Sequence, residues 1–367
     1  MKLGLSENLS TLVARRWKAA KDGGHLVFSP TQLSIITTGG IPQTVTQNLT
    51  SLGPLKYQLR FCPALAMKPQ DSKNNTSAQP KPKKVDPFEN PSPDLLIASF
   101  PPRDPTHALI LNKFPVIPDH FILSTRAWKA QTDILETADL AATHECLRAW
   151  GDKSASSQNR PDSSSTSTDR LFAFFNSGEE SGASQSHRHI QFLPVEAMRS
   201  SAGDSWKPLI DFVTSQPRNR STFQSHPSLP FTHFALPLPP NPAPETLHSI
   251  YTTLYRAAVG AVQGLDPRDG LPSVADHGPS AISYNLAMTL ETMMIVPRRS
   301  ETAHVPVDVS AAGDIADPGL VSLNGTILAG TLMVKAEAEW DVLRAQPDVL
   351  GRILRDVGVP GPGHASL

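Results

Sequence analysis

The stretch Ser181-Gly-Ala-Ser-Gln-Ser-His-Arg-His-Ile-Gln-Phe-Leu-Pro194 decides the fold prediction, because it has the pattern of a small-residue turn followed by a strand. Alternate residues of a strand share a face, so His187, His189 and Gln191 should lie together and Arg188 should face away. Three polar side chains on one strand face are costly to bury without a purpose. The small residues of the turn let backbone N–H groups approach an anion closely. The stretch therefore predicts a phosphate-binding turn beside two histidines.

The His-x-His pair has two other interpretations. It is often an ordinary surface or core feature, because so short a pattern arises by chance. Two histidines two positions apart on a strand can also bind one metal ion, which needs further ligands. Candidates for those ligands are Glu196, His233 and His120, and the spacing selects none of them.

Outward from this stretch, the chain alternates short apolar runs with turn residues, which predicts many short strands. Neighbouring strands joined by short turns, without an alternating strand–helix repeat, predict an α+β fold: a twisted antiparallel sheet with flanking helices. The expected strands are 55–62, two within 106–125, 171–175, 186–193, 231–238, 283–289, 292–297 and one within 322–334. The expected helices are 5–22, capped by Ser6 or Ser10, 137–150, 244–263 and 336–357.

Length and composition suggest how the chain is divided. Its 367 residues suffice for two domains or one large one. We expect an N-terminal catalytic part, 1–215, and a C-terminal part, 225–367, that completes the site. Residues 69–93 and 152–170 have few apolar side chains, so we expect both to be mobile, solvated connectors.

The charge balance points to neither nucleic acid nor an acidic membrane as a partner, because 33 basic residues face 34 acidic ones. No apolar run approaches the ~20 residues of a membrane span. Cys62 and Cys146 are expected to be free thiols, as in an intracellular protein. We therefore expect a cytoplasmic protein, with the nucleus as an alternative. The expected oligomeric state is a monomer.

The pattern Gly182-Ala-Ser-Gln-Ser-His-Arg-His-Ile-Gln191 resembles the active-site strand of the fungal diadenosine-tetraphosphate (Ap4A) phosphorylases, or ATP adenylyltransferases. These belong to the histidine-triad superfamily, together with galactose-1-phosphate uridylyltransferase. Further segments resemble that family in the same order, which makes the match specific: Leu111–Leu123, Gln131–Asp133, Phe175–Gly178, Ser283–Leu286, Val296–Ser300 and Gly330–Lys335.

The resemblance implies a role for each residue of the strand face. It makes His189 the nucleophile, and a neutral imidazole needs no strong base for that role. His187 would orient the strand and the hydrogen bonds of the nucleophile. Gln191 replaces the third histidine of the hydrolase branch, as is typical of the transferases. The implied substrate contacts are Lys68, Leu111, Asn112, Asn176, Gly182, Ala183, Ser184, Gln185, Asn324, Gly325, Thr326, Thr331 and Lys335, with Thr331 standing where the family commonly has methionine.

The implied activity is the reversible phosphorolysis of Ap4A to ATP and ADP through an adenylyl-histidine. The expected partners are thus Ap4A, ATP, ADP and inorganic phosphate, without a tightly bound cofactor. Mg²⁺ can accompany the polyphosphate. The alternatives are a dinucleoside-polyphosphate hydrolase, an ADP-forming sulfate adenylyltransferase, and a nucleotide-binding protein without turnover.

Overall fold

The structure is a computed structural model that describes residues 3–38, 54–67, 86–151, 170–199, 206–214, 223–307 and 319–360. Helices and strands alternate irregularly along this part of the chain, as the α+β prediction requires. Within the described residues, no helix is both long enough and apolar enough to cross a bilayer.

An eight-stranded sheet forms the centre of the molecule, and each of its neighbouring strand pairs is antiparallel. The two strands of the predicted hairpin within 106–125 pair as expected, with Leu109 opposite Leu123. In spatial order the strands are β3 (Leu96–Phe100), β4 (His107–Leu111), β5 (Phe121–Thr125), β7 (His189–Pro194), β6 (Leu171–Ser177), β9 (Ser283–Met288), β10 (Thr292–Arg298) and β8 (Phe234–Pro237).

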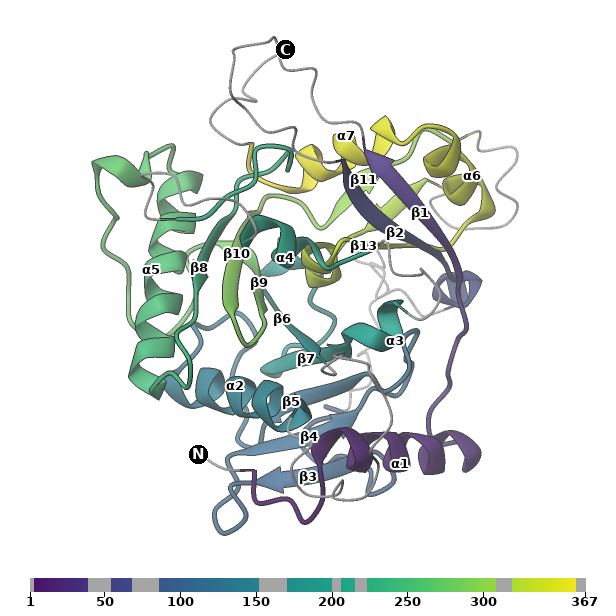
Figure 1. The fold of residues 1–367 in the computed structure, drawn as a ribbon, viewed down its shortest axis with the longest axis vertical. Coiled ribbons are helices and arrows are strands. Elements are labelled where there is room, and N and C mark those ends of the chain that lie inside the picture. Colours follow the sequence, from purple (N-terminus) through teal and green to yellow (C-terminus); the bar gives the residue numbers. More distant parts are fainter. Residues whose placement is uncertain are drawn as a thin grey trace, which may run out of the picture.

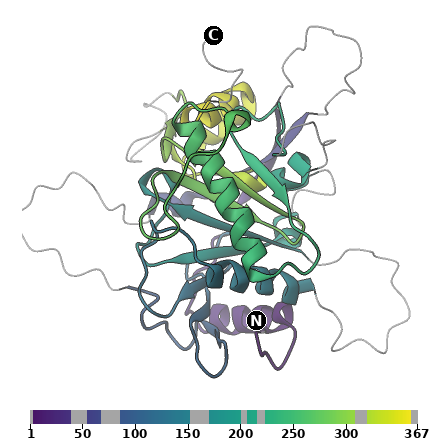
Figure 2. The same ribbon diagram turned by 90° about the vertical axis from the view of Figure 1, so that its left-hand side faces the viewer.

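Three helices pack on one face of this sheet, as Figures 1 and 2 show. They are α1 (Leu9–Asp22), α2 (Thr137–Gly151) and α5 (Pro244–Val262). The core between helices and sheet includes Phe121 and Phe192 from adjacent strands, whose rings stack with centroids 4.8 Å apart. Burying these apolar side chains fixes the register of β7, because a slip by one residue would move them to the other face.

The opposite face of the sheet carries a second layer around a small sheet of β1 (Gln32–Thr38), β2 (Leu55–Phe61) and β13 (Thr331–Val334). β13 pairs parallel with β2, whereas the large sheet is antiparallel as predicted. A parallel pair needs no hairpin, and here the two strands are far apart in the sequence. The remaining elements are α3 (Val195–Arg199), α4 (Leu209–Thr214), α6 (Glu337–Ala345), α7 (Asp348–Val357), β11 (Thr302–His304), β12 (Leu320–Ser322) and the 3₁₀ turns Pro63–Met67, Glu179–Ser181, Pro267–Asp269 and Gly325–Ala329.

Two helix predictions need correction. The first helix begins at Leu9, and its cap is Asn8, whose side chain accepts from the backbone N–H of Ser10. The single helix predicted over 336–357 is two helices, α6 and α7, because Pro347 lacks the N–H that a helix interior requires.

The two predicted parts of the chain share one sheet, since β8, β9 and β10 lie beside strands from the N-terminal half. The domain boundary at 215–225 thus stays a prediction. The connector 152–170 lies outside the described residues except for Arg170, and so do residues 69–85 of the other connector. Asp86 to Pro93 are described: Phe88 is buried against β4 and β5, while Pro87, Glu89, Asn90, Ser92 and Pro93 are exposed.

Candidate active site

The two histidines lie at the start of β7, which begins at His189 and not at residue 186 as predicted. His187 lies just before it in extended backbone, paired with Ala130. The predicted alternation of faces holds, because Arg188 turns to the helix-covered side and donates to Asp139 at 2.8 Å. The two histidine side chains meet Phe88 on the other side.

His189 has the protonation state that a nucleophile requires. Its Nδ1 lies 2.9 Å from the carbonyl oxygen of His187, so Nδ1 carries the proton and donates it. The lone pair then resides on Nε2. Burial disfavours the charged imidazolium and lowers the pKa of His189 to about 4. The ring is therefore neutral at physiological pH and has its nucleophilic nitrogen fixed in place.

Gln131 holds the backbone of the nucleophile against the neighbouring strand. Its Oε1 accepts the N–H of His189 at 2.7 Å. Its Nε2 donates to the carbonyl oxygen of Asn176 at 2.7 Å and to that of His189 at 3.2 Å. The sequence marked Gln131 as part of a family segment but gave it no role.

His187 is held from both ring nitrogens. Nδ1 lies 2.6 Å from Oδ2 of Asp86, and Nε2 lies 3.0 Å from the hydroxyl of Thr125. A carboxylate only accepts, so Nδ1 carries a proton and donates it to Asp86. The Phe88 ring centroid lies 5.8 Å from that of His187 and 5.1 Å from that of His189.

Asp86 and Phe88 are therefore site residues that the sequence interpretation missed. The available signal was Phe88, a large apolar side chain at the end of a polar run. Such a residue has a reason to be buried.

A second chain of hydrogen bonds sets the orientation of Gln191. The backbone N–H of Phe114 donates to Oδ1 of Asn112 at 2.9 Å, which identifies that atom as the oxygen. Asn112 Nδ2 therefore donates to Nδ1 of His120 at 3.0 Å, which leaves the ring proton on Nε2. His120 Nε2 then donates to Oε1 of Gln191 at 3.1 Å. The Gln191 amide consequently keeps its NH₂ group available as a donor on the face that holds the histidines.

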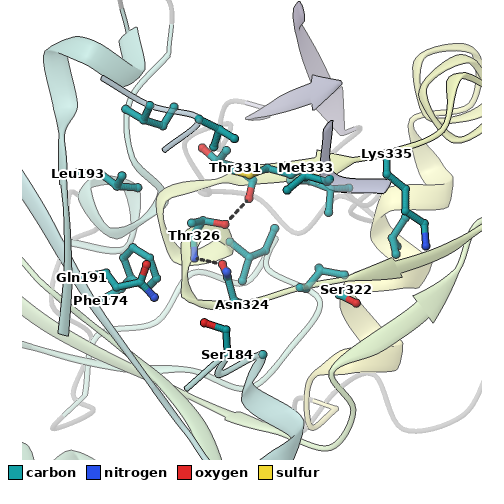
Figure 3. A pocket seen from close by; sticks show the side chains of 18 of the residues that line it. Phe174, Ser184, Gln191, Leu193, Ser322, Asn324, Thr326, Thr331, Met333 and Lys335 are labelled. Carbon is teal, nitrogen blue, oxygen red and sulfur yellow. Dashed lines mark hydrogen bonds between the residues drawn. The ribbon is translucent and has the colours of Figure 1, made fainter. Parts of the chain in front are cut away.

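A cavity of about 310 Å³ opens beside Gln191, between the large sheet and the second layer. Figure 3 shows Gln191 and Phe174 at one end of it and Lys335 at the other. The substrate contacts implied by the sequence that line it are Asn112, Gly182, Ser184, Asn324, Thr326, Thr331 and Lys335. A pocket with an apolar body and a few convergent polar groups suits a small-molecule ligand.

The polar groups on the C-terminal side are ordered by one another. The side chain of Asn324 accepts the N–H of Thr326 at 3.0 Å, and the hydroxyl of Thr326 donates to the carbonyl oxygen of Thr331 at 3.1 Å (Figure 3). The hydroxyl of Thr331 donates to Oε1 of Gln58 at 3.2 Å. The loop before β13 is therefore fixed at the cavity wall.

The turn before the histidines lies against this loop. Gly182 has φ +77°, and a Cβ there would lie 2.6 Å from the carbonyl oxygen of Leu323, so only glycine fits. Asn176 accepts the N–H of Gly325 at 2.9 Å. The turn, β6 and the C-terminal loop thus meet beside His189.

Two domain profiles match this chain. The Ap4A phosphorylase N-terminal domain matches residues 4–153 and 165–211, more than half of the chain, and the ATP adenylyltransferase C-terminal domain matches residues 227–360. The chain belongs to the Ap4A phosphorylase family. By this membership the protein is a nucleotidyltransferase, and the family resemblance inferred from the sequence is confirmed.

Relatives of known sequence and structure agree with this assignment. The chain is 28% identical to diadenosine 5′,5‴-P1,P4-tetraphosphate phosphorylase 2 of Saccharomyces cerevisiae, over 97% of this chain and 96% of that protein. It is 26% identical to protein APA1 of the same organism, over 98% and 96%. The crystal structure of yeast Ap4A phosphorylase Apa2 in complex with Ap4A matches 97% of this chain and 99% of that one, with a TM-score of 0.70 and 24% identity. The structural match confirms the predicted α+β fold with an antiparallel sheet and flanking helices.

Not every residue implied by the family pattern lies at the cavity. Leu111 packs in the core under the helices, so its side chain does not face the site. Among the described residues, Asn176, Ala183, Gln185 and Gly325 lie near the cavity but do not line it. Lys68 lies outside the described residues. The nucleophile position also lies outside the lining, two residues before Gln191 on the same strand face.

The metal interpretation gains no support from the positions of its candidate ligands. No three His, Cys, Asp or Glu side chains in the described part of the chain are grouped to hold an ion. Glu196 accepts the N–H of Arg170, and His233 accepts the N–H of His226. His120 is bonded to Gln191 instead.

Proposed function

We propose that this protein catalyses the reversible phosphorolysis of Ap4A to ATP and ADP, with His189 as the covalent nucleophile. The observation that carries the proposal is the hydrogen bond from Nδ1 of His189 to the carbonyl oxygen of His187, which leaves the Nε2 lone pair for attack. The relatives named as Ap4A phosphorylases supply the substrate class.

In the first half-reaction, Nε2 of His189 attacks the α-phosphorus of one adenylyl end. The new N–P bond forms as the bond from that phosphorus to the bridging oxygen breaks, and ATP leaves with the bridging oxygen. The Nδ1 proton stays on the imidazole, where the carbonyl oxygen of His187 stabilises the charge that develops on the ring. The intermediate is an adenylyl-imidazole.

In the second half-reaction, an oxygen of inorganic phosphate attacks the same phosphorus. The N–P bond breaks, ADP leaves, and His189 returns to its neutral form. The NH₂ group of Gln191, oriented by His120, is suited to donate to a phosphate oxygen but cannot deliver a proton at neutral pH. An amide at this position favours an acceptor that is already ionised, which phosphate is and water is not.

The cavity offers a place for the part of the nucleotide beyond the reacting phosphorus. Lys335 lies at the end away from Gln191, where a cation is well placed for polyphosphate charge. Asn324 and Thr326 lie between them along the wall. We propose these residues, with Asn112, Ser184 and Thr331, as substrate contacts.

Three further expectations form part of the proposal. The protein needs no resident cofactor, and any Mg²⁺ arrives with the polyphosphate. Turnover at saturating nucleotide would then fall on EDTA addition and recover with Mg²⁺, while dialysed protein contains no stoichiometric metal. A single cytoplasmic protomer is the expected active unit, which light scattering and cell fractionation test.

Product analysis with and without inorganic phosphate tests the proposal. Phosphate-dependent formation of ATP plus ADP from Ap4A is the expected result. Formation of ATP plus AMP regardless of phosphate would identify a hydrolase and overturn the role of Gln191. Tight nucleotide binding without any product would identify a protein that binds but does not turn over.

A further inference from the structure

Arg298 is a buried cation at the end of β10, and only 4% of its surface is exposed. Burial lowers the pKa of its guanidinium to about 10, so it stays charged at neutral pH. Its hydrogen-bond partners in the described part of the chain are all neutral oxygens. They are the side-chain oxygen of Asn285 and the carbonyl oxygens of Val357, Ser300, Glu301 and Leu323.

The guanidinium fixes the direction of a chain of amide hydrogen bonds. Arginine can only donate, so its partner atom on Asn285 is the oxygen Oδ1. Asn285 Nδ2 must then be the donor, and it bonds the side-chain oxygen of Asn176 and the carbonyl oxygen of Ser181, each at 2.9 Å. Because Arg298 can only donate, the orientation of the Asn285 amide is fixed, and so is the direction of each hydrogen bond that follows it.

Asn176 ends this chain with a donor that lacks an acceptor. Its Oδ1 receives two N–H groups, from Asn285 Nδ2 and from the backbone of Gly325, each at 2.9 Å. Turning the amide over would bring its NH₂ group against two donors. Its Nδ2 is buried and has no hydrogen-bond partner within the described residues. Other buried donors in the described residues also lack a partner, but this one lies beside the proposed nucleophile, where a ligand oxygen can complete it.

The position of Asn176 identifies that ligand. It lies on β6 beside His189, and Gln131 joins the backbones of the two residues. Arg298 and Asn285 also bind the carbonyl oxygens of Leu323 and Ser181, at the C-terminal loop and the start of the catalytic turn. The same two side chains therefore hold together the three segments that surround the reacting phosphorus in the proposed function.

We propose that Arg298 and Asn285 are positioning residues for adenylyl transfer. They hold the Asn176 amide so that Nδ2 donates to a non-bridging oxygen of the α-phosphate. The buried positive charge of Arg298 strengthens that donor through the chain of amides and favours the negative charge that accumulates in the transition state. This inference rests on the proposed function, because it assigns the oxygen to the phosphorus that His189 attacks.

The variant Asn285→Asp replaces the donor that faces Asn176 with an acceptor and keeps the volume of the side chain. An aspartate still accepts from Arg298 but cannot donate to Asn176 or to the carbonyl oxygen of Ser181. Its second oxygen attracts the Asn176 NH₂ group away from the substrate. We expect kcat/KM for Ap4A phosphorolysis to fall roughly 10–100-fold, since one misaligned donor at a developing charge costs about that much. The melting temperature should stay near the wild-type value, because the buried arginine gains a carboxylate partner. Asn8→Asp, at the partly buried cap of α1, makes the same charge change far from the site and serves as the control.

A double-mutant comparison separates positioning from a merely structural role. In an Asn176→Ala background, Asn285→Asp should change kcat/KM little further, because its effect passes through the amide that is missing. If the loss of kcat/KM in the double variant equals the product of the losses in the two single variants, the inference is overturned. So would wild-type kinetics in Asn285→Asp.

Binding of AMP and adenosine gives a readout that does not depend on turnover. Asn285→Asp should weaken AMP binding while leaving adenosine binding unchanged, because only AMP carries the α-phosphate. Equal weakening of both ligands would contradict the inference. A wild-type protein that binds AMP in this manner but does not convert Ap4A would disprove the proposed function and leave the role of the amide chain standing.

Discussion

His189 and His233 have the same local hydrogen bond and the same burial, but their Nε2 atoms have different surroundings. Each is buried, each bonds its Nδ1 to the carbonyl oxygen two residues earlier at 2.9 Å, and burial lowers each pKa to about 4. The difference lies at Nε2. His233 Nε2 accepts the backbone N–H of His226 at 2.8 Å, whereas no described residue bonds Nε2 of His189. A neutral, oriented imidazole is therefore not enough for a nucleophile, because the second nitrogen must also face a place where substrate can bind.

The largest expected effect comes from removing the nucleophile. His189→Gly should lower adenylyl transfer by about 10⁴-fold or more, since no other group can form the intermediate. Substrate binding, measured by calorimetry with Ap4A, should survive. His233→Gln is the matched control: it keeps an acceptor for the N–H of His226 and should keep wild-type turnover. Full activity in His189→Gly would show that the two histidines do not differ as described.

A smaller effect is expected from His120, which sets the orientation of Gln191. His120→Leu should lower kcat about ten-fold, because one hydrogen bond that orients a donor is lost. His120→Gln can still donate to Gln191 Oε1 and should restore much of the loss. If both variants lower kcat equally, or neither does, His120 does not act through the amide of Gln191.

The third expected effect concerns stability, as a pH dependence to which both histidines contribute. Their folded-state pKa values of about 4 lie below the ordinary value of 6.5, so the unfolded chain binds more protons between these limits. Stability should therefore fall as pH drops from about 6.5 towards 4, by up to about 1.4 kcal/mol per pH unit for each histidine. Urea unfolding at several pH values measures this slope. His233→Gln should reduce the slope, and an unchanged slope would contradict the neutral, buried state of His233.

The sequence predicted the parts of the molecule whose signals are local. Alternation along 187–192 placed the two histidines and Gln191 on one face, and the apolar runs around Pro115 to Pro118 predicted the β4–β5 hairpin. The family pattern located most of the cavity wall on the C-terminal side.

The parts that it missed depend on contacts between distant segments. Asp86 and His187 are 101 positions apart, and the role of Asp86 appears only when the chain folds over β4 and β5. Arg298 lies within the segment Val296–Ser300, which resembles the family, yet its link to Asn176 passes through Asn285 on the strand between them. The break between α6 and α7 was visible as Pro347, but the apolar periodicity on both sides outweighed it in the prediction.

Trapping the covalent intermediate tests the central claim most directly. The protein is incubated with Ap4A labelled in the adenosine moiety, without phosphate or ADP, and is denatured in alkali, in which a phosphoramidate survives. We predict one adenylyl group per active protein on the peptide that contains His189, lost on mild acid treatment and discharged to ADP when phosphate is added before denaturation. Label on another residue, or turnover by an enzyme that never carries label, would contradict the account.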